Sequence, residues 1–207
     1  KFLRYLLSSN MGEVLTVFFG VVLAGVLGLT EHAEGAVVVP LLATQILWIN
    51  LVTDSGPALA MGIDPPVDDV MSRKPRRITD RVVSGRMWLH VLFLGLVMAV
   101  LMLATMDLFL EGGLITYGHE DLETARTAAF TVMVLMQLFN AFNARSPRHS
   151  AFSHMFSNKW LWAAVLLAVV LQVAVVHVPF LQTAFGTTGL TWQQWLICFG
   201  IASIVLW

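Results

Sequence analysis

The chain has 207 residues, of which 57% are hydrophobic and only 12% are charged. Soluble domains carry roughly 25% charged residues, so this composition argues strongly against a water-soluble globule, and it excludes a disordered chain, which needs a polar and highly charged sequence. The net charge of −1 supplies no basic field for nucleic acid. The single cysteine, Cys198, excludes an internal disulfide and a cysteine metal cluster. The composition indicates an all-α, polytopic membrane protein.

Six long hydrophobic segments predict six transmembrane helices, because a barrel would instead show short segments that alternate with a period of two. The segments are residues 5–29, 37–63, 87–110, 127–143, 160–180 and 192–207. The last segment has 16 residues, which make about 24 Å of helix and fall short of a hydrocarbon core of ~30 Å. The chain also begins without methionine. We therefore expect it to be part of a larger protein.

Basic residues gather on one side of these predicted helices. Eleven of the twelve lysines and arginines precede the first helix, or lie between the second and third or between the fourth and fifth, and only Arg126 lies opposite. Basic loops stay on the cytoplasmic side. The sequence therefore predicts an integral multi-pass protein with cytoplasmic ends and a cytoplasmic loop at residues 64–86, and we expect the plasma membrane as its location.

Polar side chains inside the first, second and fourth segments are the clearest indication of function. Within each segment they recur at spacings of three or four residues, so that each set shares a helix face. The sets are Asn10 and Glu13; Asn50, Thr53 and Asp54; and Gln137, Asn140 and Asn143. Ionisable groups at this depth usually face the bundle interior and mark an ion pathway.

The second segment is expected to unwind near its middle. Pro57 removes a backbone donor and disfavours helix at Gly56, which would free carbonyl oxygens near the centre of the membrane. Irregular backbone at this depth is tolerated only where it lines a cavity or is buried in protein.

Two carboxylates, several amides, a hydroxyl and freed carbonyls together form an all-oxygen donor set. Ca²⁺ takes about six to eight oxygen ligands, and the lack of cysteine or histidine among these donors argues against copper or zinc. Alternatively, the amides hold helices together and the acids pair with basic residues. Because no lysine or arginine lies within the predicted spans, we favour a cation site.

The residues on these faces resemble a known family. Ser8–Glu13 is similar to the start of the fifth membrane helix of calcium-type P-type ATPases, and Gln45–Asp54 is similar to their sixth. Residues 64–66 (Asp-Pro-Pro) and 71–76 (Met-Ser-Arg-Lys-Pro-Arg) resemble the cytoplasmic loop that follows. Order and spacing agree over essentially the whole chain.

The resemblance implies that this chain supplies the last six of ten membrane helices of a pump that exports a cation, foremost Ca²⁺, through an ATP-driven phosphoaspartate cycle. The family's ion-ligand positions fall on Asn10, Glu13, Asn50, Thr53, Asp54 and the eighth-helix residue Gln137. ATP and Mg²⁺ would act only through upstream domains, because the Asp-Lys-Thr-Gly phosphorylation motif is absent from this sequence. The chain itself would carry no catalytic residue, and its partners would be the bilayer and those domains, with the 64–86 loop contacting the phosphorylation domain.

Gln137 departs from the two-site calcium pumps of the family, of which one carries Glu at this position. Glutamine supplies an oxygen but neither a charge nor a titratable proton. The number of ions per cycle and any proton countertransport therefore stay open. Glu13 favours a retained second site, because single-site pumps often lack an acid there.

Three other functions remain compatible with the sequence. A secondary transporter could use the same carboxylates with an ion gradient, and a non-catalytic membrane subunit could use the polar residues only to hold helices together. A pump of the same superfamily could instead carry Na⁺ and K⁺, or Mn²⁺, which also accepts oxygen ligands. An upstream Asp-Lys-Thr-Gly motif would distinguish a pump from a secondary transporter.

Overall fold

The computed structural model describes residues 2–25, 39–63, 83–111, 121–144 and 158–206, and every regular element within these ranges is a helix. Four helices are long and apolar enough to cross a membrane. They are α1 (Phe2–Val22), α4 (Gly85–Phe109), α5 (Leu122–Asn143) and α6 (Lys159–His177). They confirm the all-α class and correspond to the first, third, fourth and fifth predicted segments.

The second and last predicted segments are helical but are not single long helices. The second consists of α2 (Ala43–Trp48), the π-helix η1 (Ile49–Asp54) and α3 (Ser55–Gly62). The last consists of α8 (Trp192–Ser203) and the short 3₁₀ helix η3 (Ile204–Leu206). The count of six membrane spans therefore stays a prediction.

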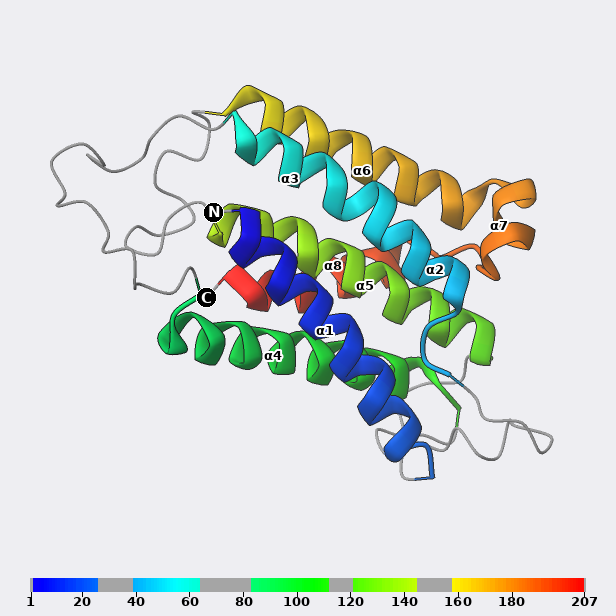
Figure 1. The fold of residues 1–207 in the computed structure, drawn as a ribbon. Coiled ribbons are helices and arrows are strands. Elements are labelled where there is room, and N and C mark those ends of the chain that lie inside the picture. The colour runs from blue at the N-terminus through cyan, green and yellow to red at the C-terminus, as the bar shows by residue number, and fades with distance from the viewer. Residues whose placement is uncertain (1, 26–38, 64–82, 112–120, 145–157, 207) are drawn as a thin grey trace, which may run out of the picture.

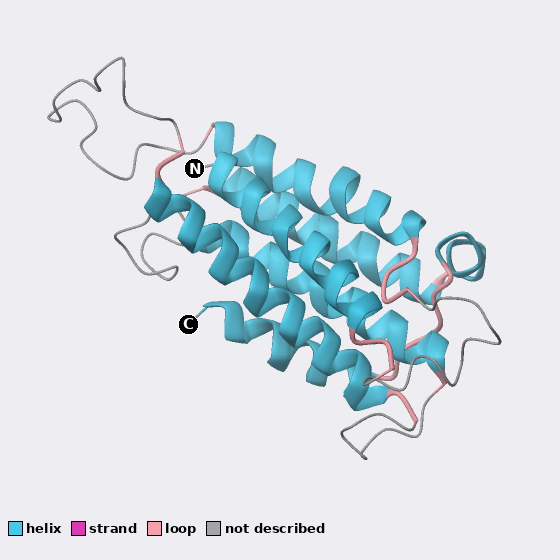
Figure 2. Cartoon of the chain, turned by 60° about the horizontal axis from the view of Figure 1, so that its bottom comes forward, coloured by secondary structure: helices cyan, strands magenta, loops and turns pink. Residues whose placement is uncertain are grey.

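The bundle is built around α5, which is buried along nearly its whole length. Figure 1 shows α3 and α6 side by side on one flank of α5, and α1 and α4 on the other, and these pairs are in contact. In the view of Figure 2 the described part consists only of helices and their connections. The central helix can therefore present side chains to both flanking pairs.

Both ends of the described chain lie at the same end of the bundle (Figure 1). Arg86 and Lys159 lie in the first turns of α4 and α6, which begin at that end, whereas Arg126 lies in the second turn of α5, which begins at the opposite end. This arrangement agrees with the predicted sidedness. Most of the 64–86 loop lies outside the described residues.

Polar caps fix where the long helices begin. Ser84 accepts a hydrogen bond from the backbone N–H of Met87 at 3.3 Å, and Asp121 accepts one from Thr124 at 2.9 Å. Hydrogen bonds from the side chain and the backbone N–H of Thr124 also lower the pKa of the Asp121 carboxyl. A cap of this kind contributes about 1 kcal/mol. Helix α5 therefore begins five residues before the predicted span, which places Arg126 within it.

The fifth predicted span ends three residues early, at His177. Val178 precedes Pro179, and the residue before a proline avoids the α conformation. Pro179 instead begins a separate short helix, α7 (Pro179–Phe185), which ends at Gly186 in the left-handed conformation with φ of 59°.

Helices α1 and α4 approach each other closely where two glycines meet. A Cβ atom at Gly95 would lie 2.8 Å from Cγ of Met11 and 3.1 Å from the backbone nitrogen of Gly12. A Cβ atom at Gly12 would lie 3.1 Å from the sulfur of Met98. Small residues allow such close packing between membrane helices, and here they fix the position of Glu13, the next residue along α1.

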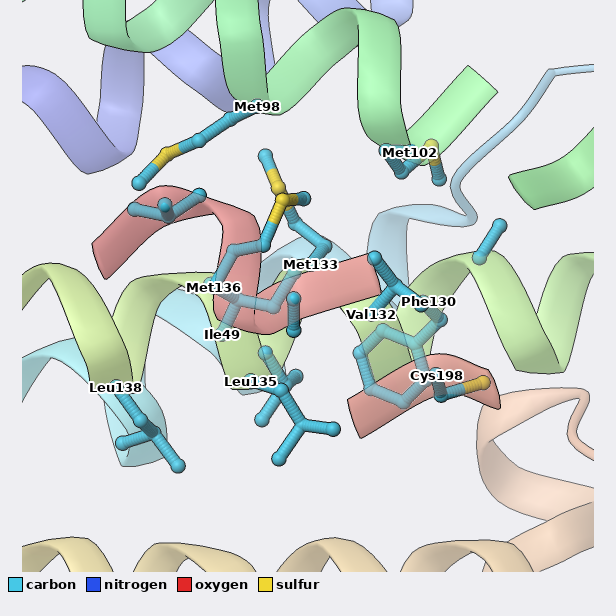
Figure 3. Packing of buried hydrophobic residues seen from close by; sticks show 14 of the residues in the cluster. Ile49, Met98, Met102, Phe130, Val132, Met133, Leu135, Met136, Leu138 and Cys198 are labelled. Atoms are coloured by element: carbon cyan, nitrogen blue, oxygen red, sulfur yellow. The ribbon is translucent and has the colours of Figure 1, made fainter. Parts of the chain in front are cut away.

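Methionines fill the space beside this crossing. Met98 and Met102 of α4 and Met133 and Met136 of α5 are fully buried, and Figure 3 shows them gathered above Ile49 and Leu135. Methionine fits irregular gaps because its side chain is unbranched and flexible. The four residues therefore pack the interior of the bundle.

The predicted unwinding at residues 55–57 is not present; the second segment widens into η1 one turn earlier. Pro57 has no N–H for the Thr53 carbonyl, and the hydroxyl of Tyr5 makes only a long contact of 3.4 Å with that oxygen. The hydroxyl of Ser55 donates to the carbonyl of Asn50 at 3.0 Å. The chain nevertheless stays helical through Pro57, which lies within α3.

Candidate functional site

Glu13 links three elements of the bundle. It is 5% exposed, and its two oxygens accept separate hydrogen bonds, Oε2 from Nδ2 of Asn50 at 2.7 Å and Oε1 from Nε2 of Gln137 at 2.9 Å. Asn50 also donates to the carbonyl of Ile46 at 3.0 Å. One predicted ligand from each of α1, η1 and α5 therefore takes part in a single hydrogen-bonded group centred on Glu13.

Asp54, the second buried carboxylate, faces α1 and is 1% exposed. Its Oδ1 accepts a hydrogen bond from the hydroxyl of Tyr5 at 2.8 Å. The same hydroxyl also lies 3.4 Å from the Thr53 carbonyl, so Tyr5 contacts both the side chain of Asp54 and the backbone of η1. Within the described residues neither carboxylate pairs with a lysine or arginine.

Tyr5 was not among the predicted site residues. It is fully buried and shares the inner face of α1 with Ser9 and Gly12, at spacings of four and three residues. A tyrosine on the polar face of an otherwise apolar helix is the signal that could have identified it.

Several buried oxygens around the two carboxylates have no hydrogen-bond partner within the described residues. Three of them belong to predicted ligands: Oδ2 of Asp54, Oγ1 of Thr53 and Oε1 of Gln137. Leaving a buried polar atom unpaired costs about 1–3 kcal/mol, and such atoms in a folded protein call for an explanation, of which an ion is one. The unpaired atoms are oxygens, as a hard cation requires.

Asn10 is the predicted ligand that the structure does not bring to this site. Its side chain is exposed, and Nδ2 donates to the carbonyl of Leu6 at 2.8 Å, one turn back on the same helix. Residues three apart on a helix are separated by about 60° around its axis. Here that difference turns Glu13 inward and Asn10 outward.

Asn140 and Asn143 connect helices instead of joining the site. Asn140 donates to the hydroxyl of Ser8 at 2.7 Å. Asn143 donates to the carbonyl of Val205 at 2.6 Å, and its own carbonyl accepts a hydrogen bond from Arg4 at 2.9 Å. Of the three polar residues predicted to share a face of α5, only Gln137 therefore makes a hydrogen bond to one of the two carboxylates described here.

The donor set suits a hard cation. No group of three or more histidine, cysteine, aspartate or glutamate side chains exists within the described ranges, so a cation held here would combine the two carboxylates with neutral oxygens. Carboxylate, amide, hydroxyl and carbonyl oxygens are the usual ligands of Ca²⁺. The residues present therefore fit such an ion.

Comparisons with known proteins agree with this chemistry. A family model described as "Cation transporting ATPase, C-terminus" matches residues 38–207. The chain is 37% identical to a calcium-transporting ATPase of Bacillus subtilis over 206 residues, which cover 99% of this chain and 21% of that protein. It is 30% identical to the endoplasmic reticulum calcium ATPase srcA of Aspergillus fumigatus over 232 residues, which cover 100% of this chain and 23% of that protein.

A plasma membrane-type relative is also similar: calcium-transporting ATPase 8 of Arabidopsis thaliana is 37% identical over 171 residues, covering 80% of this chain and 16% of that protein. The chain thus spans about a fifth of the length of the curated relatives it matches. The match to the family model covers most of the chain and includes η1 and α5. The chain belongs to the C-terminal membrane region of the calcium-type, cation-transporting P-type ATPases.

Proposed function

We propose that this chain is the membrane part of an ATP-driven pump that exports Ca²⁺, and that Glu13, Asn50, Thr53, Asp54 and Gln137 bind the transported ion. The observation that carries the proposal is the pair of buried carboxylates surrounded by unpaired oxygens. The calcium-transporting names of the relatives support the choice of ion. ATP hydrolysis, with its Mg²⁺, would belong to domains upstream of this chain.

Binding requires the two amides at Glu13 to turn. In the structure Asn50 and Gln137 present N–H groups to the carboxylate, and these donors cannot coordinate a cation. Rotation by about half a turn about the terminal side-chain torsion would present their oxygens instead, because a side-chain amide carries a donor and an acceptor on opposite arms. The amides would thus hydrogen-bond to the Glu13 carboxylate in the absence of an ion and share in coordinating the ion once it is bound.

Transport requires that the affinity of these oxygens for the ion differ between two states of the pump, because a ligand with equal affinity for both states shifts neither. The oxygens come from α1, η1 and α5, so a small relative movement of these helices changes the distances between them. Phosphorylation of an upstream domain would drive this movement. The 64–86 loop, which connects α3 to α4, is the proposed contact with that domain.

Asn10 lies on the outer face of α1, so we do not include it among the residues that bind the ion from within this bundle. Its exposure places it where an upstream membrane helix of the full protein could pack. Gln137 has no titratable proton to exchange, so we propose no proton countertransport through this residue.

The full-length protein with Asp54→Asn tests the assignment. In reconstituted vesicles this variant is expected to lose calcium-dependent phosphorylation from ATP, because it removes one of the two buried charges. Asp107→Asn, which replaces a buried acid of α4, is the matched control and is expected to retain it. Normal calcium-dependent phosphoenzyme in Asp54→Asn would refute the ion site.

The same vesicles distinguish the alternatives. A pump transports with ATP and no ion gradient, whereas a secondary transporter needs the gradient. Parallel measurements with Ca²⁺, Mn²⁺ and Na⁺ identify the cation. Transport that survives the combined Glu13→Gln and Asp54→Asn replacements would show that these residues only hold helices together.

A further inference from the structure

We propose that the protein binds the headgroup of an anionic phospholipid in a basic cavity between the N-terminal ends of α1 and α4. The cavity has a volume of about 390 Å³ and is lined by Arg4, Ser84, Arg86, Met87 and His90. Its size falls within the range of small-ligand pockets, roughly 300–1,000 Å³. It is separate from the ion site, which lies deeper in the bundle.

The lining is positively charged without a compensating acid. Two arginines and a histidine face the cavity, and no carboxylate is present among the described residues that line it. Arg4 spends one N–H on the carbonyl of Asn143, but a guanidinium has five donors, so others stay available. Arginine suits a phosphate because its planar fork can donate two parallel hydrogen bonds.

The position of the cavity along the bundle fits a headgroup. Arg86 is in the first turn of α4 and Arg4 in the first turn of α1, at the end where the chain termini lie (Figure 1). The predicted basic loops belong to the same end, which we expect to be cytoplasmic. Basic pockets between helices on this side of a membrane bind anionic headgroups.

The surface beside the cavity fits acyl chains. On α4, Leu89 and Phe93 are 70% and 64% exposed and follow Arg86 and His90 by three residues each, so they continue the same helix face away from the helix end. Trp88, 43% exposed, lies within one turn, and tryptophan prefers the membrane interface. A polar pocket above an exposed apolar face matches a phospholipid better than a free anion, which needs only the pocket.

Lipid retention by the full-length protein tests the proposal. The protein is placed in nanodiscs of equal parts phosphatidylglycerol and phosphatidylcholine, and native mass spectrometry measures which lipids remain bound. We expect phosphatidylglycerol to be enriched. A basic residue near an anionic surface contributes about 1 kcal/mol, or about fivefold, so Arg86→Gln should lower the enrichment about fivefold, and Arg86→Lys should lower it less.

Lys159→Gln is the matched control, because Lys159 begins α6 at the same end of the bundle but does not line the cavity. Equal losses in Lys159→Gln and Arg86→Gln would show that only general surface charge attracts lipid, and would overturn the proposal. So would unchanged enrichment in Arg86→Gln. A separate arm measures binding of inorganic phosphate in pure phosphatidylcholine nanodiscs; phosphate binding that depends on Arg86 would identify a free-anion site instead.

Discussion

Tyr5 shows how a neutral side chain can decide the geometry of a charged site. Its hydroxyl donates a hydrogen bond to Oδ1 of Asp54, whereas Oδ2 has no hydrogen-bond partner among the described residues. Residues that orient a metal ligand in this way typically alter affinity when they are replaced. Tyr5 is therefore a positioning residue in the proposed pump.

Tyr5→Phe should weaken calcium binding without abolishing the cycle. Loss of the hydroxyl frees Asp54 to rotate, and second-shell changes of this kind cost about tenfold or more in metal affinity. The calcium concentration for half-maximal phosphorylation should rise by about that factor while the maximal phosphoenzyme level stays unchanged. Thr105→Val removes another buried hydroxyl, one bonded to the backbone of its own helix, and should leave calcium dependence unaltered.

At the residue scale the sequence identified the polar side chains that we propose as ligands, because charges and amides are conspicuous within apolar segments. It did not predict which of them face inward. Asn10 and Glu13 are close in sequence, yet only the packing of α1 against η1 and α5 decides that Glu13 is buried and Asn10 is not. Tyr5 could not be assigned to the site from the sequence, because a tyrosine near a helix end is common at membrane interfaces.

The π-helix η1 is the element that carries the second set of proposed ligands. It contains Asn50, Thr53 and Asp54 within its six residues, and π-helical turns inside α-helices often occur at functional sites. Pro57 lies three residues beyond η1 and has no N–H for the Thr53 carbonyl, the bond that an ordinary α-turn would make there. We therefore expect the proline to favour the wider turn of η1.

Pro57→Ala should make this segment more regular and the site weaker. The alanine N–H can donate to the Thr53 carbonyl, which favours an ordinary α-turn and rotates the ligands of η1 relative to α1. We expect the apparent calcium affinity in transport assays to fall about tenfold, which corresponds to about 1.4 kcal/mol. Pro179→Ala, in the first turn of α7, should have no such effect. An equal loss of calcium affinity in Pro179→Ala would show that the loss in Pro57→Ala does not come from a change in η1.

The sequence located Pro57 correctly but assigned it the wrong consequence. A local rule predicts that proline breaks a helix. The helix instead continues through Pro57 as α3, and the hydroxyl of Tyr5, 48 residues away in sequence, lies 3.4 Å from the Thr53 carbonyl. Such long-range packing is not visible in the local pattern.

The whole bundle has an alternating topology that can be tested directly. The helix ends that flank the basic segments lie at one end of the molecule, and those that flank the acidic segments lie at the other (Figure 1). Hydrophobicity and charge sufficed to predict this arrangement, because helix length and sidedness depend on the membrane itself. The order in which helices pack around α5 depends on shape complementarity and was not predictable in this way.

Single cysteines should report the two sides of the membrane. Cys198 is buried, so it and any other cysteines of the full protein are replaced first, and one cysteine is introduced at either Gly113 or Ser150. A membrane-impermeant maleimide added to intact cells should label the first variant only, and both after permeabilisation. Labelling of both variants in intact cells would contradict the predicted topology and its six spans.

The methionines beside the glycine crossing have a mechanical consequence. Met98, Met102, Met133 and Met136 line the contact between α4 and α5, next to the helix that carries Glu13. A surface of branched side chains would lose its fit if one helix slid past another, whereas flexible thioether chains can refill the changed space by rotating their bonds. The interior next to the proposed ion site is therefore compliant, so a helix movement there meets little resistance from packing. Oxidation of these sulfurs to the polar, stiffer sulfoxide would remove that compliance.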